Sequence, residues 1–188
     1  IKEALLGIAV SNGRLPCPAS ATSNGVEGFC TLAAPSACGA EILVPPGAIP
    51  SHGRCAAQYN GFAPAITLGL AATDTQGYAI DAWGTRIRYA VTSANTNAFT
   101  KAGGMRGTGI AALVPDLFVC ATSTGITATT CNTAQALASR APAVIFSLGP
   151  NWATGGTSAD EAANPNPNSA NNDQVFVSRV RSDPGSTG

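Results

Sequence analysis

The six cysteines are the residues of this sequence with the most distinctive chemistry. They lie at positions 17, 30, 38, 55, 120 and 131, and no two of them have the Cys-x-x-Cys spacing of a zinc or redox site. The single histidine, His52, cannot complete a Cys/His cluster. An even number of cysteines without a metal-binding pattern favours three disulfides, which form in the periplasm or outside the cell. Six cysteines allow fifteen pairings, so the count alone does not identify the partners.

The other polar residues form no motif typical of catalysis. His52 precedes Gly53-Arg54, and the sequence has neither a Gly-x-Ser-x-Gly nucleophile motif nor an evident acidic partner for this histidine. The glycine-rich segment 103–107 does not end in the Lys-Ser/Thr pair of a nucleotide-binding loop. We therefore expect no catalytic residues and no enzymatic activity.

The short sequence Asp81-Ala82-Trp83-Gly84 has a carboxylate beside an aromatic ring, but it is more typical of a turn. Asp81 can accept hydrogen bonds from backbone N–H groups that follow it, and Gly84 can supply a positive φ. We expect Trp83 to be buried beneath this turn.

A calcium ion is the remaining candidate for a bound ligand. Asp160, Glu161 and Asp173 lie in a segment with several asparagines, and calcium prefers oxygen ligands of this kind. Their spacing fits no EF-hand, so a solvated loop is the alternative. No other metal or cofactor is expected.

The composition bounds the class of protein. A chain of 188 residues fits one domain, and its 45% hydrophobic content is too high for a disordered chain. Only 11% of the residues are charged and the formal net charge is zero. The chain therefore has no excess of positive charge that would bind nucleic acid or anionic lipid. No segment has the 18 or more apolar residues of a membrane span.

The N-terminal segment has the pattern of a helix with two apolar faces. The left-handed cap that Asn12-Gly13 can supply, followed by Pro16 and Pro18, marks its end. No N-cap residue precedes it, so we expect the second half of a longer helix. Such a helix must be covered on two sides, one by its own domain and one by a second partner. The two faces are formed by Ile1, Leu5 and Ile8, and by Leu6 and Val10.

The rest of the chain divides into a connection, a strand region and a tail. Residues 14–80 are expected to form a connecting loop rich in Pro, Gly, Ala and Ser, in which the apolar run 66–70 docks on the core. Residues 81–182 have strand signals, and residues 183–188 have turn composition. The elements expected in the strand region are a half-buried strand at 85–91, a strand at 117–121, a short helix at 133–140, a central strand at 143–148, a polar loop at 151–173 and a last strand at 174–180.

A helix followed by a run of strands predicts an α+β fold. We expect one domain over residues 1–188, in which residues 1–13 are the end of a long helix packed on an antiparallel sheet of about four strands. The long disulfide-tied loop lies between the helix and the sheet.

The order of these segments resembles that of the type IV pilin-like proteins and pseudopilins. The opening ten residues and the following Asn-Gly-Arg-Leu-Pro-Cys-Pro (12–18) look like the end of the long N-terminal helix of that family. Residues 66–70 and 81–91 (DAWGTRIRYAV) resemble the segment that enters its first strand. The likeness is completed by residues 141–149 (APAVIFSLG), Asp160-Glu161 and residues 175–179 (VFVSR).

The resemblance implies a globular head on a helix whose first half is a membrane anchor and later part of a filament core. That anchor, with its glutamate near the mature N-terminus, is missing here, so contact with a membrane is expected only through the missing segment. Some pseudopilins bind calcium in a late loop, which is where Asp160 lies. Proximity together with the resemblance pairs the cysteines as Cys17–Cys55, Cys30–Cys38 and Cys120–Cys131.

On this basis the chain is expected to be a structural subunit of a bacterial type IV pilus-like filament. Its partners would be further copies of itself and other pilins or pseudopilins, without a specific nucleic acid. It would reside in the inner membrane and periplasm before assembly and at the cell surface afterwards. The alternatives are a pseudopilin or minor pilin of a type II secretion or DNA-uptake machine, and a secreted binding module.

Overall fold

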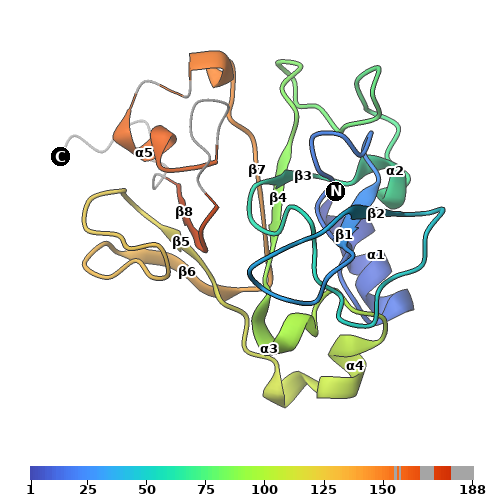
Figure 1. Ribbon diagram of the computed structural model, residues 1–188. Coiled ribbons are helices and arrows are strands. Elements are labelled where there is room, and N and C mark those ends of the chain that lie inside the picture. Colours follow the sequence, from blue (N-terminus) through green and yellow to red (C-terminus); the bar gives the residue numbers. More distant parts are fainter. Residues whose placement is uncertain (155, 157, 166–171, 179–188) are drawn as a thin grey trace.

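The described residues of the computed structural model form one N-terminal helix, several short helices and three small β-sheets (Figure 1). The structure describes residues 1–154, 156, 158–165 and 172–178. It confirms a mixed α+β fold with antiparallel sheets and three disulfides, but the single sheet of about four strands is wrong. The expected tail at 183–188, the end of the last strand at 179–180 and part of the loop 151–173 lie outside the described residues.

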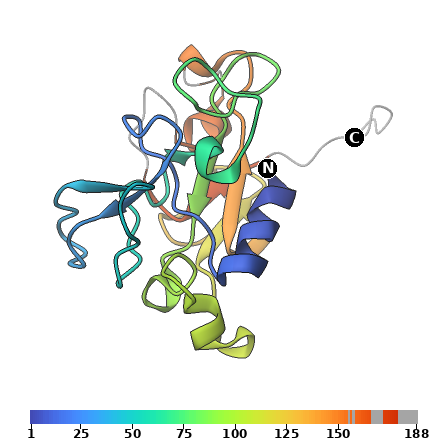
Figure 2. The ribbon, with the colours of Figure 1, turned by 90° about the vertical axis from the view of Figure 1, so that its right-hand side faces the viewer.

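Helix α1 (Lys2–Asn12) ends where the sequence predicts. Gly13 adopts the left-handed conformation with φ 63°, and its N–H donates to the carbonyl of Ala9 at 3.0 Å. Glycine is favoured there because a Cβ atom destabilises this backbone conformation. Figure 2 shows α1 lying alongside the central strands.

The central sheet contains β3 (Gly61–Phe62), β4 (Arg88–Val91) and β7 (Ala143–Phe146), all antiparallel, with β4 in the middle. The sequence predicted β4 as half-buried and the segment 143–148 as central, and both expectations are wrong. Tyr89 and Val91 pack in the cluster that contains Leu5 of α1, whereas Ala90 packs with residues of the second sheet. Because both faces of β4 are covered, β4 is the central strand and β7 lies at the edge.

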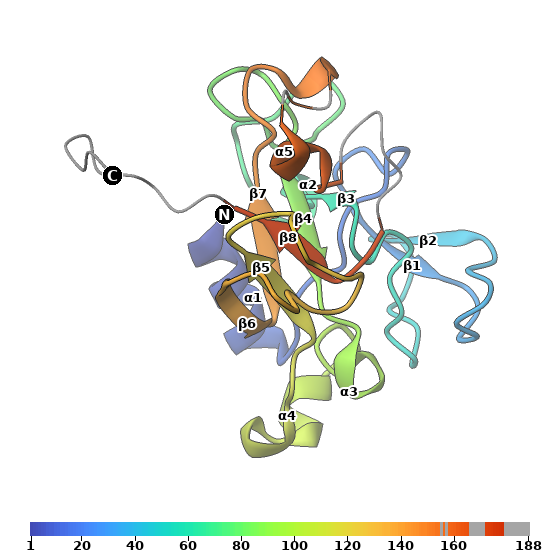
Figure 3. The same cartoon turned by 90° about the vertical axis from the view of Figure 1, so that its left-hand side faces the viewer.

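The second sheet has the order β6-β5-β8 and lies on the face of the central sheet away from α1 (Figure 3). Strand β5 (Leu117–Cys120) agrees with the predicted strand at 117–121. Strand β6 (Ala136–Ala141) replaces the predicted helix at 133–140 and pairs antiparallel with β5. Its side chains are mostly exposed, so the sequence has no alternating apolar pattern there, and Ala136, Leu137 and Ala138 favour a helix locally. Strand β8 (Val175–Val177) pairs parallel with β5, not antiparallel as expected.

The long connection is more ordered than the expected loop. It contains a two-stranded antiparallel sheet of β1 (Glu27–Cys30) and β2 (Glu41–Val44), and a short helix α2 (Ala65–Leu68). Ala65 and Leu68 of α2 are buried in the core, as the apolar run predicted. The short elements that remain are α3 (Ala94–Asn97), α4 (Gly104–Thr108), η1 (Ile110–Ala112), η2 (Trp152–Thr154) and α5 (Ala159–Ala162).

Disulfides fasten the connection and the second sheet. The three pairs are Cys17–Cys55, Cys30–Cys38 and Cys120–Cys131, as expected, and no cysteine is free. The first of them joins the segment after α1 to the segment before β3, so it closes the longest loop. The third holds the chain that leads into β6 beside β5.

Candidate assembly surface

Helix α1 is buried on one apolar face and exposed on the other. Leu5 is 5% exposed, and Ile1 and Ile8 pack against the same core cluster. On the opposite face, Leu6 is 50% exposed and Val10 is 80% exposed. The structure thus assigns the face of Leu5 to the domain and leaves the face of Leu6 and Val10 in contact with solvent.

An apolar groove runs from the end of α1 to α4 and η1. Its volume is about 480 Å³. The backbone N–H of Met105 donates to the carbonyl of Gly13 at 3.1 Å, which joins α4 to the end of α1. Arg106 is the charged residue among those that line the groove, and Ile110, at its edge, is 91% exposed. The lining residues are Ala9, Val10, Gly13, Met105, Arg106, Gly109, Ile110 and Leu113. We call the exposed face of α1 and this groove the assembly surface.

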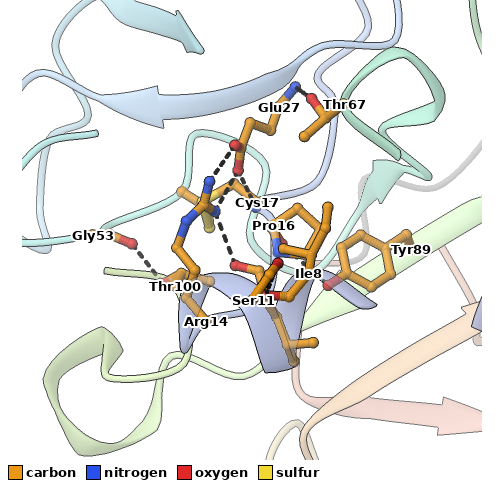
Figure 4. Close-up of polar contacts among 12 residues, drawn as sticks. Ile8, Ser11, Arg14, Pro16, Cys17, Glu27, Gly53, Thr67, Tyr89 and Thr100 are labelled. Atoms are coloured by element: carbon orange, nitrogen blue, oxygen red, sulfur yellow. Dashed lines mark hydrogen bonds and ion pairs between the residues drawn. A yellow bond between two sulfur atoms is a disulfide. The ribbon is translucent and has the colours of Figure 1, made fainter. Parts of the chain in front are cut away.

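A buried ion pair lies directly behind the end of α1 (Figure 4). Arg14 and Glu27 are both almost fully buried, and their side chains form two parallel hydrogen bonds, Nη1–Oε2 at 2.8 Å and Nη2–Oε1 at 2.6 Å. Oε2 of Glu27 also accepts from the N–H of Cys17 at 2.9 Å, and Nη1 of Arg14 donates to the carbonyl of Leu15. The carboxylate therefore ties β1 to the chain that leaves α1.

Further hydrogen bonds connect this ion pair to the neighbouring elements. The backbone N–H of Glu27 donates to the hydroxyl of Thr67 in α2, and the hydroxyl of Tyr89 in β4 donates to the carbonyl of Pro16 at 3.1 Å (Figure 4). The residues after α1 are therefore held by β1 and β4, and β1 is held in turn by α2. No local pattern in the sequence predicts this network, because its members are far apart in the chain.

Tyr89 makes the stability of the fold sensitive to alkaline pH. Burial raises the pKa of its hydroxyl above the ordinary value, the charge of Glu27 raises it further, and Arg14 partly opposes the shift. The unfolded chain releases this proton near pH 10, so we expect stability to be constant below about pH 10 and to fall above it. Urea unfolding of the wild type and of Tyr89→Phe, measured between about pH 8 and 11, tests this. The variant should lose about 1 kcal/mol at neutral pH and show a weaker alkaline decline; equal declines would contradict the assignment.

The turn at Asp81 has the predicted hydrogen bonds. Oδ1 of Asp81 accepts from the N–H groups of Trp83 at 2.9 Å and Thr85 at 2.8 Å, and Gly84 has φ 76°. Burial raises the pKa of Asp81, but the hydrogen bonds from Ser147, Thr85 and Trp83 outweigh it and hold this pKa below its ordinary value. Trp83 is 61% exposed, so its predicted burial is wrong. The carboxylate of Asp81 holds the turn through the N–H groups of Trp83 and Thr85 and through the hydroxyl of Ser147, and the ring of Trp83 takes no part in these bonds.

The three calcium candidates accept hydrogen bonds from different partners. Asp160 accepts from the backbone and side chain of Ser123, Glu161 forms a capping box with Ser158 at the start of α5, and Asp173 accepts from the N–H of Val175. Within the residues that the structure describes, no three His, Cys, Asp or Glu side chains come together as a metal site. The single histidine, His52, accepts a hydrogen bond from the N–H of Arg54 through Nδ1 at 3.0 Å.

Comparison with known proteins finds no family model, no curated protein and no solved structure that matches this chain. In the described part of the chain, no helix combines the length and the apolar character needed to cross a membrane.

Proposed function

We propose that the protein is a structural subunit of a bacterial type IV pilus-like extracellular filament, and that it assembles through the assembly surface. The observation that carries this proposal is the division of α1 into a face buried by Leu5 and a solvent-exposed apolar face with Leu6 and Val10. A surface helix of a monomeric protein has one apolar face, so a second one indicates a partner.

The partner we propose is helix α1 of a second copy, because the surface offers both a ridge and a groove. Val10 forms one wall of the groove, and Ile110 projects at its edge. Side chains of one helix that pack into the groove of a neighbour bury both sets of apolar groups. Complete burial of an exposed valine or isoleucine side chain stabilises by about 1.5–3 kcal/mol, part of which offsets the entropy lost on association.

The electrostatics support dense packing of identical copies. The formal net charge is zero, and the charged residues of α1 are Lys2 and Glu3, both in its first turn. Neighbouring copies therefore repel one another little, and the apolar face of α1 meets no charge of its own beyond that turn. The three disulfides suit a protein that functions outside the cell.

Electron microscopy of cells that make the whole gene product tests the proposal, with Val10→Asp as the variant. A carboxylate buried in an apolar interface costs several kcal/mol, so we expect at least about tenfold fewer filaments in the sheared surface fraction. Leu137→Asp is the matched control, because Leu137 is a half-exposed apolar residue on β6, on the other side of the molecule from α1 (Figure 1). Both variants should keep the melting temperature of the isolated domain within about 3 °C.

Two results would contradict this function. One is the absence of filaments from cells that make the wild-type protein. The other is an equal number of filaments with Val10→Asp and with the wild type.

A further inference from the structure

A second concave site opens on the face of the central sheet that is opposite to α1. Side chains alternate between the two faces of a strand, and Tyr89 and Val91 of β4 face the cluster that contains α1. Arg88 and Ala90 therefore face the other way. The pocket has a volume of about 440 Å³, and its lining includes Phe62 of β3, Arg88 of β4 and Trp152 of η2.

Arg88 places an unpaired positive charge in this pocket. Its Nη1 donates to the carbonyl of Asn60 at 2.9 Å, and its guanidinium lies over the ring of Phe62 at 4.4 Å. Its Nε is buried and has no hydrogen-bond partner, and no carboxylate pairs with Arg88 anywhere in the described residues. A guanidinium that is held partly out of water without a counter-charge is destabilising, so the site favours an anionic ligand.

The second arginine of the pocket is already neutralised. Nε of Arg86 lies 2.7 Å from Oδ2 of Asp74, and its guanidinium is stacked over the ring of Tyr78 at 3.9 Å. Burial raises the pKa of Asp74, but hydrogen bonds from Tyr78, Arg86 and Gln76 hold it below its ordinary value, so this carboxylate stays ionised near neutral pH. The pocket thus contains one net positive charge, and that charge belongs to Arg88.

The remaining wall is apolar and partly open. Leu148 and Trp152 line it, and the indole of Trp152 is 43% exposed at the rim. An exposed indole offers a flat surface on which a ring can stack. Nη1 of Arg88 is bound to Asn60 and its Nε is buried, so Nη2 is the nitrogen of the guanidinium that can donate to a carboxylate. Apolar walls with a few polar groups that converge on one point are typical of a small-molecule site.

We propose that this pocket binds a small carboxylate that is attached to a six-membered ring, with the carboxylate on Arg88 and the ring against Trp152. Two sources share this chemistry: a uronic acid residue of a surface polysaccharide and an aromatic carboxylic acid. The site is independent of the assembly surface, since the two lie on opposite faces of the central sheet.

Isothermal titration calorimetry with the purified chain of 188 residues tests the proposal. D-glucuronate and benzoate are the carboxylate probes, and D-glucose and benzyl alcohol are their neutral counterparts. We expect at least one carboxylate to bind about tenfold or more tightly than its neutral counterpart, because hydrogen bonds to a charged group are strong. The acid that binds identifies the source of the ligand. Equal affinity of both acids and their neutral counterparts, or no binding of either acid, overturns the proposal.

Variants distinguish binding at this site from nonspecific electrostatic attraction of the acid to the protein. Arg88→Gln should weaken the carboxylate about tenfold or more, and Trp152→Ala should weaken it severalfold. Arg140→Gln is the control, because it removes the same charge from an exposed position of β6 outside this pocket and should leave affinity unchanged. If Arg88→Gln does not fold, Trp152→Ala decides, since Trp152 is partly exposed in η2. Wild-type affinity in a folded Arg88→Gln, or in Trp152→Ala, would show that the ligand does not occupy this pocket.

Discussion

Replacing Glu27 by alanine will lower the free energy of unfolding by about 3–5 kcal/mol. The reason is that Arg14 is 4% exposed and Glu27 is 1% exposed, so removal of the carboxylate leaves a guanidinium buried without its counter-charge. The same change deprives the N–H of Cys17 of its acceptor. An unpaired buried donor adds to the cost, because it was hydrogen-bonded to water in the unfolded chain.

Equilibrium unfolding in guanidinium chloride, under conditions that keep the disulfides intact, measures this loss. Glu27→Gln should be less destabilising than alanine, because the amide oxygen can still accept from Cys17 or Arg14. Glu3→Gln is the control, since Glu3 is exposed in the first turn of α1 and should change stability by less than about 0.5 kcal/mol. The double variant Arg14→Met, Glu27→Leu should be more stable than Glu27→Ala, because it leaves no charge behind. A loss below about 1 kcal/mol for Glu27→Ala would show that the pair is not buried as described.

Local signals in the sequence predicted those parts of the fold that local chemistry determines. Gly13 and the prolines after it determine the end of α1, and the apolar run at 117–121 determines β5. Strand β6 could not be predicted in this way, because it is held by its ladder to β5 and by the nearby disulfide of Cys131, and its side chains are mostly exposed. The parallel pairing of β8 depends on where the chain returns after a long segment, which no local pattern encodes.

The candidate binding surfaces, too, could be predicted only in part from the sequence. The sequence predicted that α1 has two apolar faces, but only the packing of Leu5 into the core identifies Val10 as part of the exposed face. The half-buried strand predicted at 85–91 would have one solvent-exposed side, and Arg86 and Arg88 would lie on it. That side is instead partly covered, and the two arginines differ because Asp74, twelve residues before Arg86, pairs with Arg86 alone. The pairing of charges that are distant in the sequence depends on the fold, so the spacing of the residues along the chain does not predict it.

Removing the disulfide Cys17–Cys55 through Cys17→Ala and Cys55→Ala should lower the free energy of unfolding by about 4 kcal/mol. Its half-cystines are separated by 38 residues, and a longer closed loop restricts the unfolded chain more. Alanine is preferred to serine because both cysteines are buried and a hydroxyl would need a partner. The matched control is the pair Cys30→Ala and Cys38→Ala, with a separation of 8 residues, for which the same relation gives about 2.6 kcal/mol.

The stability lost with the Cys17–Cys55 disulfide and the stability lost with the Glu27 carboxylate should not simply add. Cys17 belongs both to this disulfide and to the hydrogen bonds of Glu27. Once the disulfide is absent, the chain after α1 can move so that Arg14 reaches water, and Glu27→Gln should then cost less than it does in the wild type. Unfolding of the four proteins of this double-mutant cycle measures the coupling, which for residues in contact is about 0.5–3 kcal/mol. The control cycle with Cys30 and Cys38 should give a smaller coupling, since neither cysteine has a hydrogen bond to Glu27 or Arg14 in the described structure. Additive losses in the first cycle would mean that the disulfide and the ion pair hold the end of α1 independently.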